Sequence, residues 1–209
     1  MRSLGAVLIV CSAVAAPQAA RAEYFEKVVS LEGLLVLPAF TSQSNTAFAA
    51  ASFGPRLSVA FGIAQDVYLL GRFAAWFYNG VVDGITETTT RGTYTGRLWF
   101  SGEGFRPELG VRWRLLSGHD IAPYAEGYVG YQWSTFRNLD LRNAGGGSYG
   151  LTLGDFARGR ATVAGGLSAD IRLGNMVFLG ISVLWTQLLR ENLYRGDLSL
   201  GARAAFYWF

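Results

Sequence analysis

The chain has 209 residues, of which 51% are hydrophobic and 16% charged, and its mean hydropathy is +0.24. These values are high for a secreted soluble protein, yet no run after residue 22 reaches the roughly 20 apolar residues of a membrane helix. The 18 basic and 15 acidic residues nearly balance, so the charge gives no support for nucleic acid as a partner.

Residues 1–22 have the pattern of a secretory signal peptide. Arg2 provides the positive charge, residues 4–14 the short apolar run, and residues 20–22 the small-x-small cleavage site. A transmembrane anchor is the alternative, but the apolar run is too short to span a bilayer, and Pro17 follows it closely. We therefore expect residues 23–209 to form one mature domain.

The only cysteine, Cys11, lies in the segment that we expect to be removed. The mature chain then has neither a disulfide framework nor a thiolate ligand or nucleophile. The chain shows no cluster of histidine and cysteine with metal-ligand spacing, so the sequence predicts no metal and no cofactor.

Alternating segments, in which every second residue is apolar, predict eight β-strands. They cover residues 28–40, 53–64, 67–78, 97–115, 122–134, 157–173, 176–189 and 198–209. In the fourth segment the alternation changes phase, which predicts a bulge near Gly102 or Gly104. In the last, Leu200 and Phe206 fall on an apolar face, whereas Ser199 and Arg203 fall on a polar one.

The connections between these segments alternate in length. Residues 65–66, 117–120 and 174–175 are short turns, residues 41–52, 79–95 and 135–155 are long and polar, and residues 190–196 are intermediate. This alternation is typical of an even-stranded barrel in an outer membrane, with both mature termini on the periplasmic side. The sequence thus predicts an all-β fold: an eight-stranded antiparallel up-and-down transmembrane β-barrel.

Aromatic residues gather near the ends of the predicted strands, where rings of aromatic side chains flank the lipid in such barrels. We expect Trp76, Trp133, Phe136 and Trp185 in the outer ring, and Tyr124, Tyr207 and Trp208 in the inner one.

The chain resembles the small outer-membrane barrels of Gram-negative bacteria, the class that contains the OmpA transmembrane domain, OmpW and the opacity-type proteins. The resemblance covers residues 28–209 and depends on the strand pattern and the terminal Phe209. It implies that Tyr207 and Phe209 form the signal read by the barrel-assembly machinery, although Phe209 falls on the polar face. It also implies outer-membrane lipid and lipopolysaccharide as partners.

Charged residues on the polar faces would meet inside the barrel. The predicted lumenal charge network comprises Glu32, Arg56, Arg72, Arg106, Glu108, Arg112, Glu126, Arg160, Asp170 and Arg203. Arg112 is expected opposite Glu126, and barrel closure is expected to bring Arg203 near Glu32. Two interpretations remain: a salt-bridged plug that fills the lumen, or a polar path or anion site that uses surplus arginines.

The sequence therefore predicts a non-enzymatic outer-membrane protein with a structural role or a surface-recognition role through its long loops, and with an unidentified surface ligand. A channel for small or hydrophobic solutes is the first alternative. A lipid-modifying enzyme is the second, because Ser117, His119 and Asp120 are neighbours in the sequence. Their place in a predicted periplasmic turn favours a turn over a catalytic triad, whose members converge from separate segments.

Overall fold

The computed structural model describes residues 26–41, 46–48, 51–116, 121–151, 153–174, 176–189 and 194–208. Most of these residues lie in strands, as the alternating pattern predicts. The strands are β1 (Lys27–Thr41), β2 (Thr46–Phe48), β3 (Ser52–Ala64), β4 (Val67–Thr89), β5 (Gly92–Arg114), β6 (Ile121–Arg142), β7 (Phe156–Arg172), β8 (Val177–Leu188) and β9 (Tyr194–Trp208). Within the described ranges, no helix is long and apolar enough to cross a membrane.

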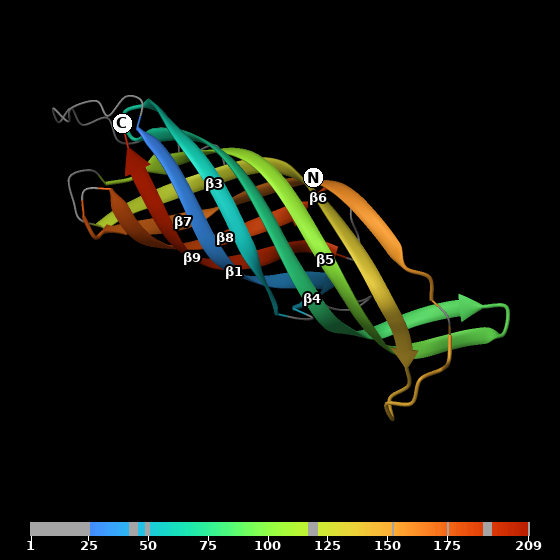
Figure 1. Cartoon of the computed structure of the whole chain (residues 1–209). Helices are drawn as coiled ribbons and strands as arrows, with labels where there is room; N and C mark the ends of the chain where they lie inside the picture. Colours follow the sequence, from blue (N-terminus) through green and yellow to red (C-terminus); the bar gives the residue numbers. More distant parts are fainter. Residues whose placement is uncertain are drawn as a thin grey trace.

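The strands form one antiparallel sheet that closes into a ring (Figure 1). Strand β9 returns to pair with β1 along most of its length, with Leu31 opposite Ala204. The three-residue β2 pairs with the end of β1 and lies outside the ring. The ring therefore consists of eight strands, β1 and β3 to β9, which confirms the predicted barrel. Closure pairs the two edges of the sheet, as a strand wall in lipid requires.

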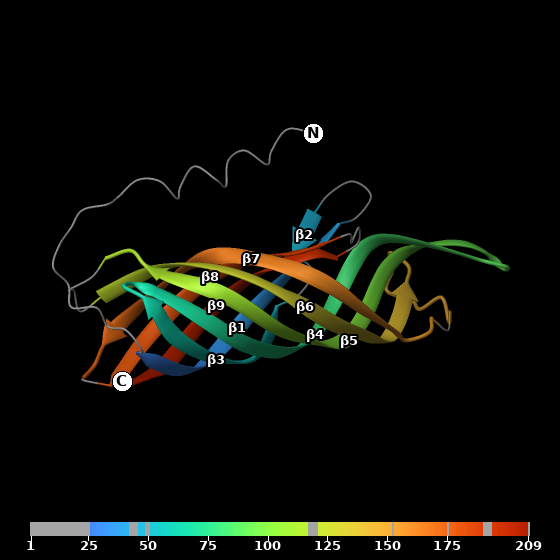
Figure 2. The same ribbon diagram turned by 90° about the horizontal axis from the view of Figure 1, so that it is seen from above.

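One of the predicted long loops, residues 79–95, consists largely of strand, and another, residues 135–155, begins with strand. Strand β4 continues to Thr89 and β5 begins at Gly92, so residues 79–101 form a ribbon, here called the arm, whose base also pairs with β6. The arm extends well beyond the other strands in both views (Figures 1 and 2). Strand β6 likewise runs on to Arg142. The polar composition that suggested loops is compatible with a ribbon in water, because cross-strand pairing satisfies its backbone hydrogen bonds.

Two irregularities of the sheet lie at the base of the arm. Relative to β5, β4 carries one extra residue after Val82, and β6 carries one extra residue beside Asn138. Around Gly102 and Gly104 the register between β5 and β6 is regular, so the predicted bulge there is wrong. The alternation of apolar and polar residues changes phase because the apolar side chain of Phe100 points into the lumen and packs there. The residues of β5 keep the same inward and outward faces throughout.

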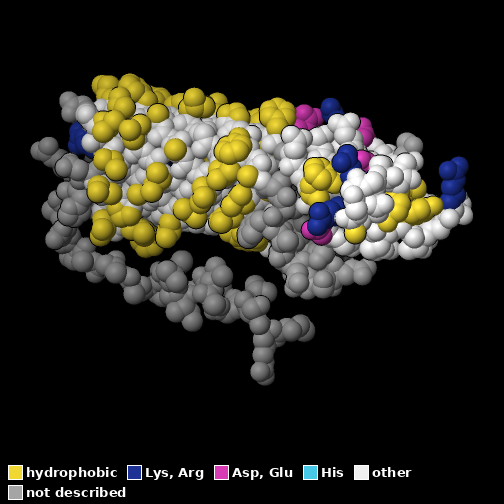
Figure 3. All heavy atoms as spheres, turned by 90° about the horizontal axis from the view of Figure 1, so that it is seen from below, with side chains coloured by type: hydrophobic (Ala, Val, Ile, Leu, Met, Phe, Trp, Pro, Cys, Tyr) yellow, Lys and Arg dark blue, Asp and Glu magenta, His cyan; other side chains and the backbone are white. Residues whose placement is uncertain are grey.

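The outside of the barrel is apolar. Large exposed side chains include Leu31, Phe53, Phe73, Phe77, Leu109, Val129, Trp133, Leu167, Ile181 and Trp185, which together represent every ring strand except β9, where Leu200 and Phe206 are exposed. In the face shown in Figure 3, hydrophobic side chains cover the barrel, and most charged ones lie toward the arm. A surface of this kind is stable against lipid and not against water.

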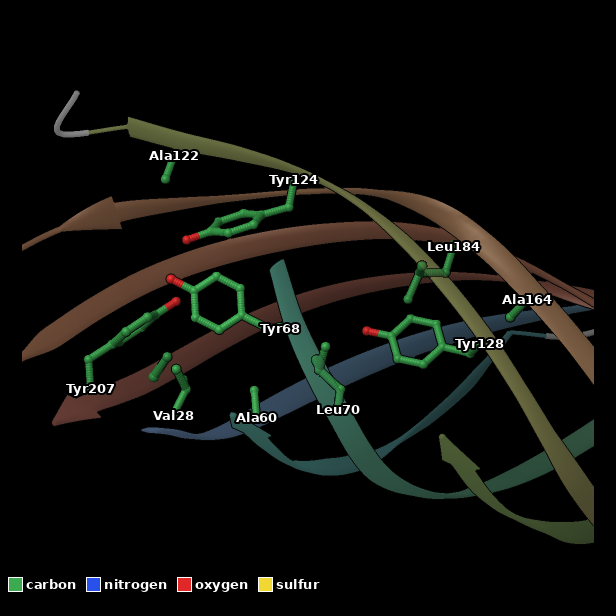
Figure 4. Packing of buried hydrophobic residues seen from close by; sticks show 11 residues of the cluster. Val28, Ala60, Tyr68, Leu70, Ala122, Tyr124, Tyr128, Ala164, Leu184 and Tyr207 are labelled. Carbon is green, nitrogen blue, oxygen red and sulfur yellow. The ribbon is translucent and has the colours of Figure 1, made fainter. Parts of the chain in front are cut away.

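The lumen holds two apolar clusters at different levels of the barrel. The aromatic cap, at the arm end, consists of Leu34, Val36, Ala74, Trp76, Val82, Phe100, Phe136 and Leu188. The tyrosine cluster, toward the opposite end, consists of Val28, Ala60, Tyr68, Leu70, Ala122, Tyr124, Tyr128, Ala164, Leu184, Ala205 and Tyr207 (Figure 4). Trp76, Phe136, Tyr124 and Tyr207 are thus buried inside, and their expected place in the lipid-facing rings is wrong, because they share strand parity with the lumenal charges.

Candidate functional site in the barrel lumen

A belt of ionised side chains crosses the lumen below the aromatic cap and interleaves with the tyrosine cluster. It comprises Arg56, Arg72, Arg106, Arg112, Arg114 and Arg203 together with Glu26, Glu32, Glu108, Glu126, Asp170 and Asp197. All are buried except Arg114, whose side chain is 16% exposed. Alternation along the strands points these side chains inward. Six arginines face six carboxylates, so the charged belt is neutral.

Arg72 and Glu108 form a direct cross-strand pair between β4 and β5. Arg72 Nε donates to Glu108 Oε2 at 2.5 Å, and both side chains are almost fully buried. The Arg72 guanidinium also lies 3.2 Å from the centroid of the Tyr128 ring. One step nearer the cap, Arg106 Nη1 donates to Asp197 Oδ2 at 2.6 Å. Buried charges of this kind are stable only while both partners are present.

Asp170 is held by two arginines from different strands. Arg112 Nη2 donates to its Oδ2 at 2.6 Å, and Arg203 Nε donates to its Oδ1 at 2.7 Å. Arg112 stands opposite Glu126 in the register, with Nε 3.1 Å from Glu126 Oε1. The Nε–H does not point at that oxygen, so this contact is electrostatic, and the charge-assisted hydrogen bond of Arg112 goes to Asp170.

Glu32 and Arg203 are paired in the backbone register of the closed barrel, but their side chains have different partners. Their Cα atoms are partners across β1 and β9, as the sequence predicts. Their side chains diverge: Glu32 accepts from Arg56 Nη1 at 2.9 Å and from the Ser182 hydroxyl, whereas Arg203 contacts Asp170 and Glu126. Closure therefore brings Arg203 near Glu32, as expected, but the two side chains take other partners.

Tyrosine hydroxyls complete the belt at the end away from the arm, where those of Tyr68, Tyr124 and Tyr207 point toward one another (Figure 4). Tyr68 donates to Glu26 Oε2 at 2.5 Å and accepts from Arg114 Nη2 at 2.5 Å. Tyr207 donates to Asp170 Oδ2 at 2.8 Å. Phenol groups therefore add hydrogen bonds to charges that also have ion-pair partners, such as Asp170 with Arg112 and Arg203.

Nine of the ten residues of the predicted network are buried in the lumen. The tenth, Arg160, is half-buried and donates from Nη1 to the Gly159 carbonyl oxygen at 2.8 Å. Tyr207, which the resemblance assigned to the assembly signal, has its side chain inside the barrel. Phe209, His119 and the predicted signal peptide lie outside the described residues.

The sequence interpretation missed two carboxylates of the belt, Glu26 and Asp197. Asp197 shares its strand parity with Ser199 and Arg203, and that signal would have identified it had the last strand been extended upstream. Glu26 immediately precedes β1, where no alternation marks it. Because these two acids balance the arginines, the buried belt carries no surplus of positive charge for an anion.

The lumen is tightly filled at the level of the belt. The described side chains enclose a void of about 10 Å³ beside Arg72, Arg112 and Glu126, which is the space of about one water molecule. On the arm side of this void, Trp76 and Phe100 are buried in the aromatic cap. The described part of the chain also holds no group of three potential metal-ligating side chains.

The arm carries a second set of organised polar contacts, outside the barrel wall. The turn after β6 folds back on it: Tyr149 donates to the Thr95 carbonyl oxygen at 3.0 Å, and its ring lies 5.2 Å from that of Tyr94. Asp140 accepts from the Ser148 hydroxyl and from Arg142, and these hydrogen bonds hold the pKa of the carboxyl below its usual value. The tip of this turn is thereby fixed in position.

Comparison with solved structures shows which barrels share this arrangement. The chain superposes on Ail, the attachment invasion locus protein of Yersinia pestis, with a TM-score of 0.51 at 15% identity, over 88% of this chain and 99% of that one. A major outer membrane protein of Thermus thermophilus matches with a TM-score of 0.55 at 12% identity, over 87% and 99% of the two chains. The fold is that of the outer-membrane β-barrels.

OprG of Pseudomonas aeruginosa matches similarly, with a TM-score of 0.51 at 13% identity, over 88% of this chain and 96% of that one. At these identities the likeness extends to the fold and not to an activity or a ligand. No protein-family model matches the chain, and no curated protein matches its sequence.

Proposed function

We propose that this protein is a non-conducting barrel of the outer membrane, which stabilises the envelope and presents the arm as a recognition surface. The observation that carries the proposal is the filled lumen. Six paired arginines, six carboxylates and the aromatic cap occupy the interior that a solute would have to cross. A ring of about eight strands has room for side chains and little else.

Planar-bilayer recording of the purified, refolded protein tests this proposal. We expect no stable conductance at any holding potential, with a general porin in the same bilayer as the positive control. Reproducible single-channel steps would refute it and would favour transport of small solutes, the first alternative.

The mature protein should also show heat-modifiable mobility on unboiled gels, as folded barrels in detergent do. Mass spectrometry should show that it starts at Glu23.

The orientation of the arm is part of the proposal, with both mature termini in the periplasm. Arg91 lies exposed in the turn that joins β4 and β5 at the tip of the arm. In intact cells we expect trypsin to cut at Arg91, and the matched variant Arg91→Gln to resist cleavage there. Protection of Arg91 until the outer membrane is permeabilised would place the arm on the inner side and contradict the recognition role.

Lipopolysaccharide, the barrel-assembly machinery and a surface ligand belong to this proposal as partners. The fold supports them, and a structure of Ail has been determined in complex with the heparin analogue sucrose octasulfate. The enzyme alternative depends on His119. Lipid A profiles that are unchanged by His119→Ala would remove it, whereas a lost modification would replace the recognition role with catalysis.

A further inference from the structure

A groove of about 450 Å³ lies at the base of the arm, outside the lumen. Asn79 and Val81 of β4, Trp99 and Ser101 of β5, and Asn138 of β6 line it. Asn79 follows the exposed Phe77 by two residues on the same face of β4, so the groove lies just beyond the apolar band. The groove is thus placed where the wall leaves the lipid.

The groove combines an aromatic face with neutral hydrogen-bonding groups. Trp99 is 43% exposed, and the Arg142 guanidinium lies 4.9 Å from its ring centroid. Asn138 Nδ2 donates to Ser101 Oγ at 2.8 Å, which orients both side chains. The Asn138 amide oxygen and the whole Asn79 amide make no hydrogen bond to any described residue. They offer both donors and acceptors to a ligand.

Backbone irregularities on both sides of β5 shape this groove. The extra residue of β4 lies opposite Arg97 and that of β6 lies opposite Phe100, so the two irregularities flank Trp99 along β5. Asn138 has a φ of 54°, a left-handed conformation that is uncommon for a residue other than glycine. Bulges of this kind re-aim side chains and are frequent next to binding sites. This uncommon backbone conformation occurs at the position where the Asn138 amide is directed toward Ser101.

The charges around the groove cancel in pairs. Arg97 contacts Asp83 at 2.8 Å, and Arg137 contacts Glu103 at 2.9 Å. Arg142 contacts Asp140 at 2.7 Å. Three arginines are therefore matched by three carboxylates, and the surroundings offer no excess charge to an ionic ligand. A ligand that suits the groove is neutral, has one apolar face for Trp99, and carries hydroxyls for the amides.

We infer that the groove binds a neutral saccharide ring, stacked on Trp99 and hydrogen-bonded by Asn79, Asn138 and Ser101. A pyranose has this chemistry, since its C–H face is apolar and its hydroxyls both donate and accept. The inference deepens the proposed recognition role and rests on it. The saccharide has two sources, the headgroup of a membrane glycolipid or a soluble glycan at the cell surface.

The test is calorimetric titration of the full mature protein, refolded in a zwitterionic detergent without sugar, with a panel of neutral oligosaccharides. Trp99→Ala should weaken binding at least about tenfold. Asn79→Ala removes an amide without a partner, and Asn138→Gly keeps the left-handed backbone; each should weaken binding without loss of heat-modifiable mobility. Trp185→Ala, which removes an indole of similar exposure from the lipid-facing wall, is the matched control and should bind normally.

Sulfated forms of the same sugars measure the role of charge. Tighter, salt-sensitive binding of the sulfated forms would mark an anion site and overturn the inference, as would the absence of binding or equal losses in Trp99→Ala and Trp185→Ala. Titration in nanodiscs with and without glycolipid separates the sources: competition by the glycolipid identifies a membrane headgroup, and undiminished binding identifies a soluble glycan. Failure of all sugars, with Arg91 still cut in intact cells, refutes this inference and leaves the proposed function standing.

Discussion

Replacing the Arg72–Glu108 pair measures whether the lumen is a dry, filled interior. Both side chains are almost fully buried and 2.5 Å apart at their nearest atoms. Arg72→Met and Glu108→Leu each leave one buried charge without its direct partner, and each should cost about 3–5 kcal/mol of unfolding free energy. The double variant exchanges the pair for apolar groups of similar volume, so its cost should be close to zero or change sign. Because each single change costs about 3–5 kcal/mol and the double change close to zero, the coupling energy should be about 6–10 kcal/mol.

Urea unfolding of the protein in lipid vesicles, followed by tryptophan fluorescence, provides these free energies. The matched control is the Arg97–Asp83 pair of the arm, which has a similar distance, 2.8 Å, but side chains that are 58% and 73% exposed. Its coupling should stay below about 1 kcal/mol. If the Arg72–Glu108 coupling is no larger than that of the exposed pair, the lumen is hydrated, and the argument for a filled barrel fails.

Three further predictions follow from the contacts of the belt, the cap and the turn after β6. Arg112→Met should cost more unfolding free energy than Glu126→Gln in the same urea assay, because Arg112 holds both Asp170 and Glu126; equal costs would contradict its connecting role. Glu126→Ala should leave planar bilayers without conductance, because the aromatic cap still closes the lumen, whereas channel steps would make Glu126 part of a gate. Because hydrogen bonds lower the pKa of Asp140 in the folded state, its contribution to the order of the turn is present above the unfolded pKa of about 3.9 and is lost as the pH falls through the folded value. Limited proteolysis of residues 143–150 should therefore accelerate only in strong acid, and Ser148→Ala should shift that acceleration to higher pH.

Much of the barrel can be predicted from the sequence because alternate residues of a strand face lipid and lumen, and these two environments favour apolar and polar side chains respectively. Leu31, Leu109 and Ile181 are exposed, while Glu32, Glu108 and Ser182 beside them are buried, so the period of two identifies the strands and their faces. The same period indicates which charges enter the lumen, since a strand cannot change faces without a bulge.

Other features are decided by the tertiary structure. Arg112 and Arg203 both reach Asp170 across the lumen, and Glu32 takes Arg56 in place of Arg203, its neighbour in the register. Long side chains can cross the lumen and bind partners on strands that are not neighbours in the sheet. The alternation along one strand shows that a side chain points inward, but it does not show which residue of the opposite wall that side chain contacts. The arm escaped prediction for a related reason: outside lipid, a paired ribbon needs no apolar face, and its strands lack the alternation that reveals the rest.

The sequence by itself thus determined the eight-stranded wall, its lipid-facing exterior and most members of the charged belt, because one-dimensional alternation encodes a two-sided surface. Only the tertiary structure decided that the belt is neutral, since Glu26 and Asp197 join it from strand ends. It also decided that Trp76 and Phe136 close the lumen instead of facing lipid, and that the base of the arm forms a groove. These properties depend on which side chains from different strands meet in space. Barrel closure, the register of the strands and the positions of the bulges together determine which side chains meet.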